Sequence, residues 1–367
     1  KKMELREKFG FGCMRLPMKD KEVDLEQVNQ MVDEFIEAGF NYFDTAHGYL
    51  DGLSETAVRE CVAKRYPRDA YYLTNKLTSN FFNSYEDLMP LFELQLKQCG
   101  VDYFDYYLLH AMNREYYKKY TSCRAFEFVQ ELKQANKIKH IGMSFHDQPE
   151  LLDKILSEHP EIEVVQIQFN YLDADNPNVE SDKVYQVCVK HHKPVIVMEP
   201  VRGGRLADLP AEAGKVLDEL HGGSYASYAL RYAASFDQVF MVLSGMSSLE
   251  QMRDNLATMK DFKKMNEEEF VAVAKVREIL KTLHQIECTA CQYCVAGCPK
   301  QIPIPDIFAL YNAKKTYNDW TSASNYKKCT ENKGKASDCI KCGKCEHACP
   351  QHLKIRDLLE EAAKVFE

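Results

Sequence analysis

The sequence lacks the features that mark several classes of protein. No apolar run approaches the roughly 20 residues that a membrane-spanning helix needs, which excludes an integral membrane protein. Basic residues are not in excess, since 47 Lys and Arg stand against 55 Asp and Glu and the net charge is −8, and this excludes a mainly basic nucleic-acid-binding protein. The chain is not polar enough to be disordered, because 45% of its 367 residues are hydrophobic. It can therefore bury a large core.

The beginning of the sequence also lacks a hydrophobic signal core, and we therefore expect a cytoplasmic protein. Cysteine, by contrast, is abundant, with 14 residues. Nine of them crowd into the last 80 residues and require a specific explanation. Scattered thiols in a cytosolic chain are mostly small buried side chains. Five cysteines are scattered in this way: Cys13, Cys61, Cys99, Cys123 and Cys188.

From residue 11 to about residue 255 one pattern repeats, in which a short apolar run is followed by a stretch with helical periodicity. Eight such runs predict strands, over 11–14, 40–44, 71–75, 104–109, 138–142, 163–168, 194–198 and 239–243. Parallel strands need helical crossovers, so eight strands alternating with helices predict an α/β fold of the (β/α)8 TIM barrel type. The competing architecture is a doubly wound open sheet, but no G-x-G-x-x-G follows an early strand.

The helix predicted over 24–38 shows how strong the periodic signal is. Asp24 is suited to cap its N-terminus, and Gly39 stands where a left-handed residue ends many helices. Apolar residues at 3- and 4-residue spacing predict one buried face, formed by Leu25, Val28, Met31, Val32, Phe35 and Ile36. A last helix of the barrel is predicted over 266–283.

After residue 286 the chain changes to short polar loops, prolines and cysteines, and the spacing Cys-x2-Cys-x2-Cys-x3-Cys-Pro occurs twice. This is the bacterial ferredoxin run, in which three thiolates on a tight loop bind one [4Fe–4S] cluster and the fourth Cys binds the other cluster. The rule assigns to one cluster Cys288, Cys291, Cys294 and Cys349. It assigns to the other cluster Cys298, Cys339, Cys342 and Cys345.

Two other interpretations of these cysteines are less favoured. Zinc sites usually present two pairs of ligands rather than triplets with a trailing Cys-Pro, and disulfides conflict with the missing signal core. Cys329 fits neither run and is expected to be a free thiol, and the segment from Asp306 to Lys315 is predicted to be helical. The region resembles dicluster ferredoxins. We therefore predict two domains, a barrel over 1–283 and a small, mostly helical two-cluster domain over 284–367.

Four ionisable residues fall at the ends of predicted barrel strands or in the loop that follows. Chemistry in (β/α)8 barrels lies at this carboxyl-terminal face. Each residue alone also has an ordinary explanation, as a helix cap, a packed ring, a solvated amine or a buried imidazole. The four are Asp44, Tyr49, Lys76 and His110.

Together these four residues resemble the catalytic tetrad of the aldo-keto reductase family, and the resemblance covers roughly residues 3–280. The supporting motifs are GFNYFDTA at 39–46, IGMS at 141–144, QIQ at 166–168, and GMSS at 245–248 with Asn255. The resemblance implies that Tyr49 donates a proton to a carbonyl oxygen and that His110 orients this carbonyl. A free tyrosine has a pKa near 10, which the Lys76 ammonium would lower while Asp44 keeps that ammonium charged.

The resemblance also implies a nicotinamide cofactor. It assigns Ser144 and Gln166 to the carboxamide, and we expect Gly203, in the loop after the seventh strand, to offer backbone amides to the pyrophosphate. The loop after the eighth strand would hold the adenosine phosphate end through Gly245, Ser247, Ser248, Gln251 and Asn255.

Three positions depart from the family pattern. The Asn that usually follows the serine, the aromatic residue that stacks on the nicotinamide, and the basic residues that grip a 2′-phosphate are replaced. In their places stand Phe145, either Met198 or Glu199, and Gly245 with Gln251. Only Arg253 remains as a basic residue nearby. The loss of the basic residues favours NADH over NADPH, and a flavin is an alternative cofactor.

The combination predicts an oxidoreductase that reduces a small carbonyl or oxidises an alcohol with NAD(P)H and is coupled to electron transfer through two [4Fe–4S] clusters. A hydride carries two electrons, whereas a cluster passes one at a time, so a flavin or a redox partner such as a ferredoxin would join the two. One alternative is an electron-transfer protein or flavin-dependent reductase with the barrel as docking platform, and another makes the clusters structural. No nucleic-acid partner is expected.

Overall fold

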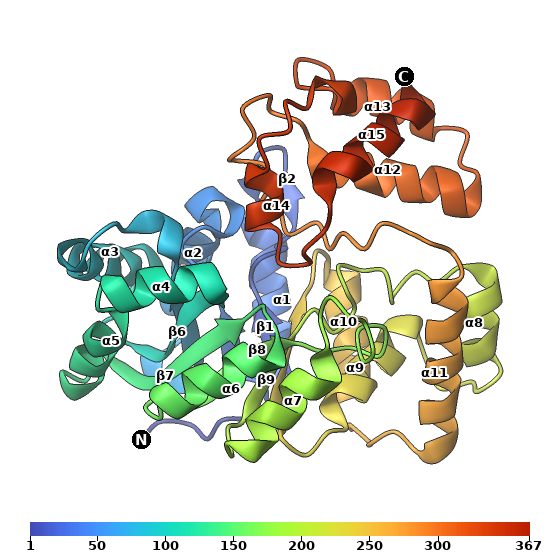
Figure 1. Ribbon diagram of the computed structural model, residues 1–367. Helices are drawn as coiled ribbons and strands as arrows, with labels where there is room; N and C mark the ends of the chain where they lie inside the picture. The colour runs from blue at the N-terminus through green and yellow to red at the C-terminus, as the bar shows by residue number, and fades with distance from the viewer. The chain divides into compact units, whose positions relative to one another are not determined.

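The computed structural model describes residues 1–367, and the chain divides into two compact units (Figure 1). The barrel unit comprises residues 1–200 and 227–265. The cysteine unit comprises residues 201–226 and 266–367. No helix of either unit is long and apolar enough to cross a membrane.

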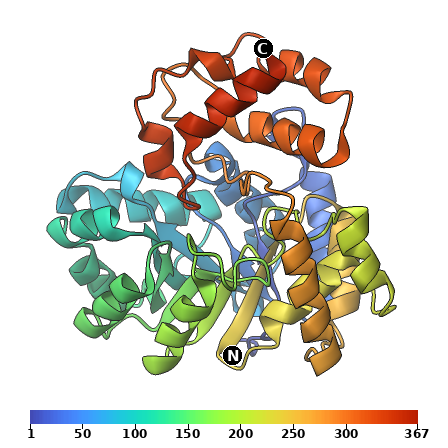
Figure 2. The ribbon, with the colours of Figure 1, turned by 45° about the vertical axis from the view of Figure 1, so that its right-hand side comes forward.

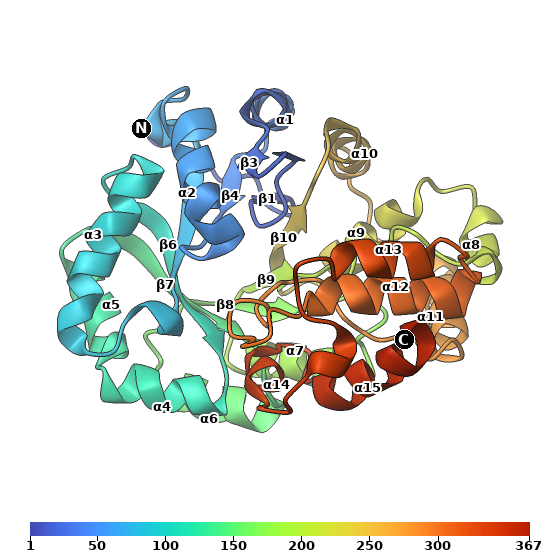
Figure 3. The same cartoon turned by 90° about the horizontal axis from the view of Figure 1, so that it is seen from above.

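Eight parallel strands form a closed barrel in the barrel unit, in the order β1-β10-β9-β8-β7-β6-β5-β4, and Figure 3 shows them as a ring with helices outside it. The strands are β1 (Gly10–Gly12), β4 (Tyr42–Asp44), β5 (Tyr72–Leu77), β6 (Phe104–Met112), β7 (Ile138–Phe145), β8 (Val164–Gln168), β9 (Val195–Met198) and β10 (Val239–Gly245). All eight predicted strands are confirmed. The open doubly wound sheet is wrong, because β1 pairs with both β4 and β10 and so closes the barrel.

Helices connect the strands and cover the barrel. They are α1 (Leu25–Glu37), α2 (Leu53–Val58), α3 (Leu88–Cys99), α4 (Arg114–Ser122), α5 (Ala125–Gln134), α6 (Pro149–Glu158), α7 (Ser181–Lys190), α9 (Tyr225–Ala234) and α10 (Leu249–Met259). Short 3-10 or π turns span Tyr49–Gly52, Arg59–Ala63, Arg68–Ala70, Ser79–Phe81 and Tyr85–Asp87. A two-residue hairpin, β2 (Met18–Lys19) with β3 (Glu22–Val23), is too short to leave a periodic signal in the sequence.

Helix α1 begins and ends as its sequence predicts. The Asp24 side chain accepts a hydrogen bond from the Gln27 amide, and Gly39 has a φ of +96°, which favours glycine. Four of the six predicted apolar residues are buried, namely Val28, Met31, Val32 and Phe35. Leu25 is 40% exposed, so the buried face begins one turn after the start of the helix.

Two apolar layers hold the barrel together. Outside the strands, Phe35 of α1 meets the ring of Phe43 edge to face with 5.3 Å between centroids, and Phe43 stacks on Phe11 of β1 at 5.7 Å. Alternate residues from β4, β6, β8, β9 and β10 meet inside the barrel: Tyr42, Tyr106, Leu108, Val164, Ile196, Met241 and Leu243. Each such buried side chain contributes about 1.5–3 kcal/mol of transfer free energy. A Cβ on Gly142 would lie 2.3 Å from the Leu108 side chain, so only glycine fits this position.

The cysteine unit is helical, with α8 (Ala211–Asp218), α11 (Glu267–Lys281), α12 (Ile304–Tyr317), α13 (Ser322–Cys329), α14 (Lys344–Ala348) and α15 (Ile355–Phe366), and a 3-10 turn over Ala336–Asp338. Helices α8 and α11 lie side by side (Figure 2). The helices predicted over 266–283 and 306–315 are present as α11 and as the centre of α12. The first of them was expected to end the barrel, but its contacts group it with the cysteine unit. The apolar core around the cysteines is small, built mainly from Ile286, Ile302, Ile304, Ile307, Phe308, Tyr326, Ile355 and Leu359.

Candidate active site and metal centres

The four predicted catalytic residues come from the carboxyl-terminal ends of three neighbouring strands. Asp44 ends β4, Lys76 lies next to last in β5, and His110 lies in β6. Tyr49 begins the 3-10 turn that follows β4. Because β4, β5 and β6 pair in parallel register, their ends meet at one face of the barrel.

Lys76 is the centre of this group. Its Nζ donates to Asp44 Oδ2 at 2.8 Å, to the Thr45 carbonyl oxygen at 2.9 Å and to Tyr49 Oη at 3.1 Å. An ammonium has three N–H bonds, and the structure gives each of them a partner. Lys76 is fully buried and Asp44 is 3% exposed, so the ion pair is almost completely removed from water.

Burial and pairing act on this ion pair in opposite directions. Burial raises the pKa of Asp44 and lowers the pKa of Lys76, while the attraction between the two charges opposes both shifts. The second carboxylate oxygen of Asp44, Oδ1, has no hydrogen-bond partner within the protein. The hydrogen bond between Lys76 and Asp44 fixes the position of the ammonium group. The Tyr49 hydroxyl lies next to this ammonium group.

His110 completes the group from the other side of Tyr49. The two rings meet edge to face with centroids 5.9 Å apart, and His110 Nδ1 lies 2.7 Å from the Thr78 hydroxyl. The Tyr120 hydroxyl donates to the His110 carbonyl oxygen at 2.6 Å. Burial, and next the charge of Lys76, hold the pKa of His110 well below its usual value, so the imidazole is neutral at pH 7.

The loop that carries Tyr49 is also supported by Glu55, His47 and Asn75, which were not predicted as site residues. Glu55 of α2 is fully buried, and its carboxylate lies 2.6 Å from His47 Nδ1 and accepts from Asn75 Nδ2 at 2.8 Å. Leu50 and Asp51, directly after Tyr49, both have positive φ values, which are costly for side chains other than glycine. Glu55 is the one charged residue among the buried residues of α2, and this is what marks it in the structure.

Ser144 and Gln166, the predicted carboxamide ligands, lie opposite each other on the paired strands β7 and β8. The Ser144 hydroxyl accepts from the Ala111 amide at 2.7 Å, and Gln166 Nε2 lies 3.6 Å from the Met198 sulfur. Gln166 Oε1 is buried and has no hydrogen-bond partner within the protein. Buried acceptors are nearly always paired, so this oxygen fits a carboxamide N–H of a nicotinamide.

The five predicted residues of the β10 loop surround the start of α10. Ser248 caps the helix by accepting from the Gln251 amide, and Gln251 Oε1 accepts from the Ser247 amide at 2.7 Å. Asn255 Nδ2 donates to the Ser244 hydroxyl, so it braces the strand that leads into the loop. A Cβ on Gly245 would lie 3.2 Å from the Arg15 side chain.

Both remaining basic residues near this loop are engaged in ion pairs. Arg253 Nε lies 2.8 Å from Glu34 Oε1, and Arg15 Nη2 lies 3.1 Å from Glu199 Oε1. Glu199 is one of the two residues at the position of the usual aromatic ring. The charge near the loop is thus balanced by carboxylates.

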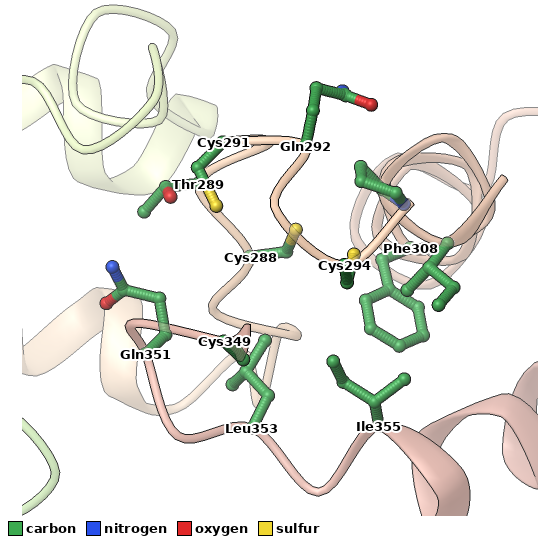
Figure 4. A pocket seen from close by; sticks show the side chains of 12 residues that line it. Cys288, Thr289, Cys291, Gln292, Cys294, Phe308, Cys349, Gln351, Leu353 and Ile355 are labelled. Atoms are coloured by element: carbon green, nitrogen blue, oxygen red, sulfur yellow. The ribbon is translucent and has the colours of Figure 1, made fainter. Parts of the chain in front are cut away.

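The eight ferredoxin-type cysteines separate into two groups around two hollows. Cys288, Cys291 and Cys294 lie on one loop and Cys349 on the segment facing it, around a small hollow that we call the first hollow (Figure 4). The second hollow is lined by Cys298, Cys339, Cys342 and Cys345. These are the two sets that the ferredoxin rule assigns, and each hollow offers four thiols and a mostly apolar wall, which fits an iron–sulfur cluster.

The two cysteine loops have the same backbone conformation. The residues on either side of the middle cysteine have positive φ in both, namely Ala290 and Gln292 in one loop and Lys341 and Gly343 in the other. An amide donates to the sulfur of the first cysteine at 3.4 Å in each loop. No two of the 14 cysteines form a disulfide.

Gly203 lies in the cysteine unit rather than in the barrel unit with the other predicted cofactor ligands. It has a φ of +66°, and a Cβ there would come within 2.6 Å of the Thr289 carbonyl oxygen. Its backbone therefore packs against the first cysteine loop, and its contact with a cofactor stays a prediction.

A closed parallel barrel with a buried Asp–Lys–Tyr group at its strand ends, in a chain with two four-cysteine hollows, defines an oxidoreductase. The chain belongs to the aldo-keto reductase family, because the model described as "Aldo/keto reductase family" matches residues 8–278. A second model, described as "4Fe-4S dicluster domain", matches residues 287–354 and supports iron–sulfur clusters over zinc or disulfides.

Similar proteins carry related names. An uncharacterized oxidoreductase of Bacillus subtilis, YqkF, is 24% identical over 297 residues, which is 72% of this chain and 90% of that protein. An aldo-keto reductase of Mycolicibacterium smegmatis is 27% identical over 225 residues, which is 61% of this chain and 74% of that protein. The solved holo form of aldo-keto reductase AKR11C1 from Bacillus halodurans is 26% identical with a TM-score of 0.61 and covers 73% of this chain and 91% of its own.

Proposed function

We propose that this chain reduces a small carbonyl compound, or oxidises the corresponding alcohol, with a nicotinamide cofactor in the barrel, and that two [4Fe–4S] clusters pass single electrons in the domain over 284–367. The observation that carries the proposal is the buried ammonium of Lys76, held by Asp44 and lying 3.1 Å from the Tyr49 hydroxyl. This arrangement is suited to giving a proton to an oxygen that becomes negatively charged.

Each residue of the group has a distinct part in this reaction. A reduced nicotinamide held by Ser144 and Gln166 would supply the hydride that the carbonyl carbon needs. Tyr49 gives its hydroxyl proton to the carbonyl oxygen, and the Lys76 ammonium stabilises the phenolate that remains. Neutral His110, whose Nδ1 faces Thr78, presents Nε2–H to the same carbonyl oxygen and orients it. Hydride and proton together convert the carbonyl to an alcohol.

The cofactor contacts follow from the two barrel positions and the β10 loop. The orphaned Oε1 of Gln166 and the Ser144 hydroxyl would hold the carboxamide, and the start of α10 would hold the phosphate end. NADH is favoured over NADPH because Arg253 is already paired with Glu34 and Gly245 has no side chain to grip a 2′-phosphate.

Clusters bound in the two hollows would transfer single electrons, a function that a simple carbonyl reductase does not have. Cys288, Cys291, Cys294 and Cys349 would bind one cluster, and Cys298, Cys339, Cys342 and Cys345 would bind the other. Clusters exchange one electron at a time, so a ferredoxin or another redox protein would be the partner. The second candidate function is an electron-transfer protein or flavin-dependent reductase, and it is favoured by the hollows themselves, which ordinary carbonyl reduction does not need.

The deciding experiment compares Tyr49→Phe with Tyr72→Phe after anaerobic purification. Tyr72 is the matched control, because its hydroxyl donates only to the Met3 carbonyl oxygen at an exposed site. We expect Tyr49→Phe to lose about 10²–10⁴-fold in carbonyl reduction with unchanged iron–sulfur absorbance, and Tyr72→Phe to retain activity. Unchanged turnover in Tyr49→Phe would favour the second candidate. Released NAD(H) and about eight iron atoms per chain would support the proposal, whereas a released flavin would redirect it.

A further inference from the structure

The two cysteine loops share one backbone conformation but not one environment. At the first hollow, Glu287 precedes the first cysteine and Gln351 follows the trailing Cys-Pro, and Gln351 is 3% exposed. The equivalent residues at the second hollow are Asp338 and Lys300, and both are exposed. The two hollows therefore differ in the residues that flank their cysteines and in what lies against them.

Arg202 is the residue that lies there. It is 1% exposed, its Nη1 donates to the Glu287 carbonyl oxygen at 2.9 Å, and its Nη2 donates to Gln351 Oε1 at 3.1 Å. One guanidinium thus joins the segment before Cys288 to the segment after Cys349, which supply the first and the fourth thiol of one hollow. The carboxylate of Glu287, 3.6 Å from Nη2, balances part of its charge.

The loop that carries Arg202 is held in an unusual conformation. Arg202, Gly203 and Gly204 have φ values of +51°, +66° and +95°, and this region is unfavourable for an arginine. Gly203 packs so tightly on Thr289 that no side chain fits there. The unfavourable backbone conformation of Arg202 therefore accompanies the placement of its buried charge beside the first cysteine loop.

Arg356 provides the comparison at the second hollow. Its Cζ lies near Gly343 of the second cysteine loop, but its side chain is 44% exposed and pairs with Glu346 at 2.7 Å. An exposed charge is screened by water and salt, whereas a buried one is screened much less. The Arg202 guanidinium, by contrast, is buried and donates to residues that flank Cys288 and Cys349.

We propose that Arg202 is a positioning and tuning residue of the cluster bound by Cys288, Cys291, Cys294 and Cys349, and that it selectively raises the reduction potential of that cluster. The reason is electrostatic, because a cluster gains one negative charge on reduction and a nearby buried cation stabilises the reduced form. The electron exchanged is conserved, since an external single-electron donor loses the electron that this cluster gains. The inference rests on the clusters of the proposed function.

The test is an anaerobic redox titration of the full chain, with dithionite as electron donor and electron paramagnetic resonance as readout. In Arg202→Gln we expect one of the two components to become about tenfold harder to reduce, which is about 59 mV for a one-electron couple. Glu287→Gln, which removes the balancing carboxylate at a partly exposed site, should move the same component in the opposite direction. Arg356→Gln is the matched control and should move neither component.

Two results would overturn the inference. Either both Arg202→Gln and Glu287→Gln leave the two components where they are in the native chain, or both variants move the two components equally. If Arg202→Gln loses iron, Glu287→Gln alone decides by the presence or absence of its selective shift. Failure of the proposed function looks different. Unchanged turnover in Tyr49→Phe would contradict the barrel chemistry and leave the titration as it is, and a native chain without iron would show no signal to titrate.

Discussion

The barrel site and the two hollows hold their reactive groups in opposite ways. In the barrel, Lys76 already has three hydrogen-bond partners and lies fully buried in a large core. In the cysteine unit, four thiols surround each hollow and only a small apolar core lies around them. The barrel therefore defines its site without a ligand, whereas the cysteine loops need a bound group to join their segments. Removal of the bound metal should therefore unfold the cysteine unit and leave the barrel folded, whereas barrel variants should change chemistry without loss of iron.

The largest expected effect is that of removing iron. Chelation of the anaerobically purified protein should abolish the cooperative folding of residues 286–367, because a small domain gains most of its stability from its metal groups. The barrel should remain folded. Limited proteolysis with mass spectrometry would show cleavage confined to the cysteine unit. Cys329→Ser should keep its iron, since Cys329 lines neither hollow, and an iron-free chain with an intact cysteine unit would contradict the contrast.

The second largest effect is expected from removing the Lys76 ammonium group in the barrel site. Lys76→Met leaves the Asp44 carboxylate buried without its cation, which should cost about 3–5 kcal/mol of stability. Carbonyl reduction should fall about 10²–10⁴-fold while the iron content stays constant. Urea unfolding and steady-state kinetics measure the two effects.

The double variant Asp44→Asn/Lys76→Met is the control for this prediction. It removes both charges, so it should recover much of the lost stability and none of the lost activity. Equal stability of the single and double variants would show that Asp44 and Lys76 do not act as a buried ion pair.

A smaller effect is expected below the Tyr49 loop. Glu55→Gln turns one acceptor oxygen of a buried carboxylate into a donor that faces His47 or Asn75, which should cost about 1–3 kcal/mol. Turnover should fall about tenfold because the loop that positions Tyr49 loosens. Glu60→Gln, on the exposed surface beside Lys64, is the matched control and should change neither quantity. A Glu55→Gln variant with native stability would contradict the supporting role of Glu55.

The smallest effect concerns pH. Burial holds the pKa of His110 well below its usual value of about 6.5, so below pH 6.5 the unfolded chain binds a proton that the folded chain does not. The stability from neutral His110 is therefore present above pH 6.5 and is lost as the pH falls, by up to about 1.4 kcal/mol per pH unit. Urea unfolding of the native chain and of His110→Gln at pH 7.5 and 5.5 should show a difference that shrinks on acidification. A constant difference would refute a neutral, buried His110.

Much of the fold could be predicted because strands, helices and helix ends depend mainly on residues that are close together in the sequence. Eight apolar runs give the eight strands, and Asp24 with Gly39 marks the ends of α1. The grouping of cysteines follows from spacing alone, because a tight loop can bring only three thiols to one hollow. The prediction that Leu25 is buried is wrong. Periodicity indicates which side of a helix is apolar, but not how far the neighbouring layer extends along it.

Contacts between distant segments could not be predicted. Arg202 reaches Gln351 across 149 residues, and nothing in the sequence near either residue indicates that they meet. The same holds for Arg15 with Glu199, which brings a β1 loop residue to the end of β9. Glu55 is buried only because His47 and Asn75 happen to face it, and a single sequence does not show which charged residue of a helix finds such partners.

The crossing of the fourth cysteine has a consequence for truncation. Residues 1–345 contain every cysteine of the second hollow, whereas the first hollow also needs Cys349. The two ligand sets are therefore interleaved along the chain, and the segment after residue 345 matters to only one of them. Truncation after residue 345 would leave one site complete and the other with three thiols.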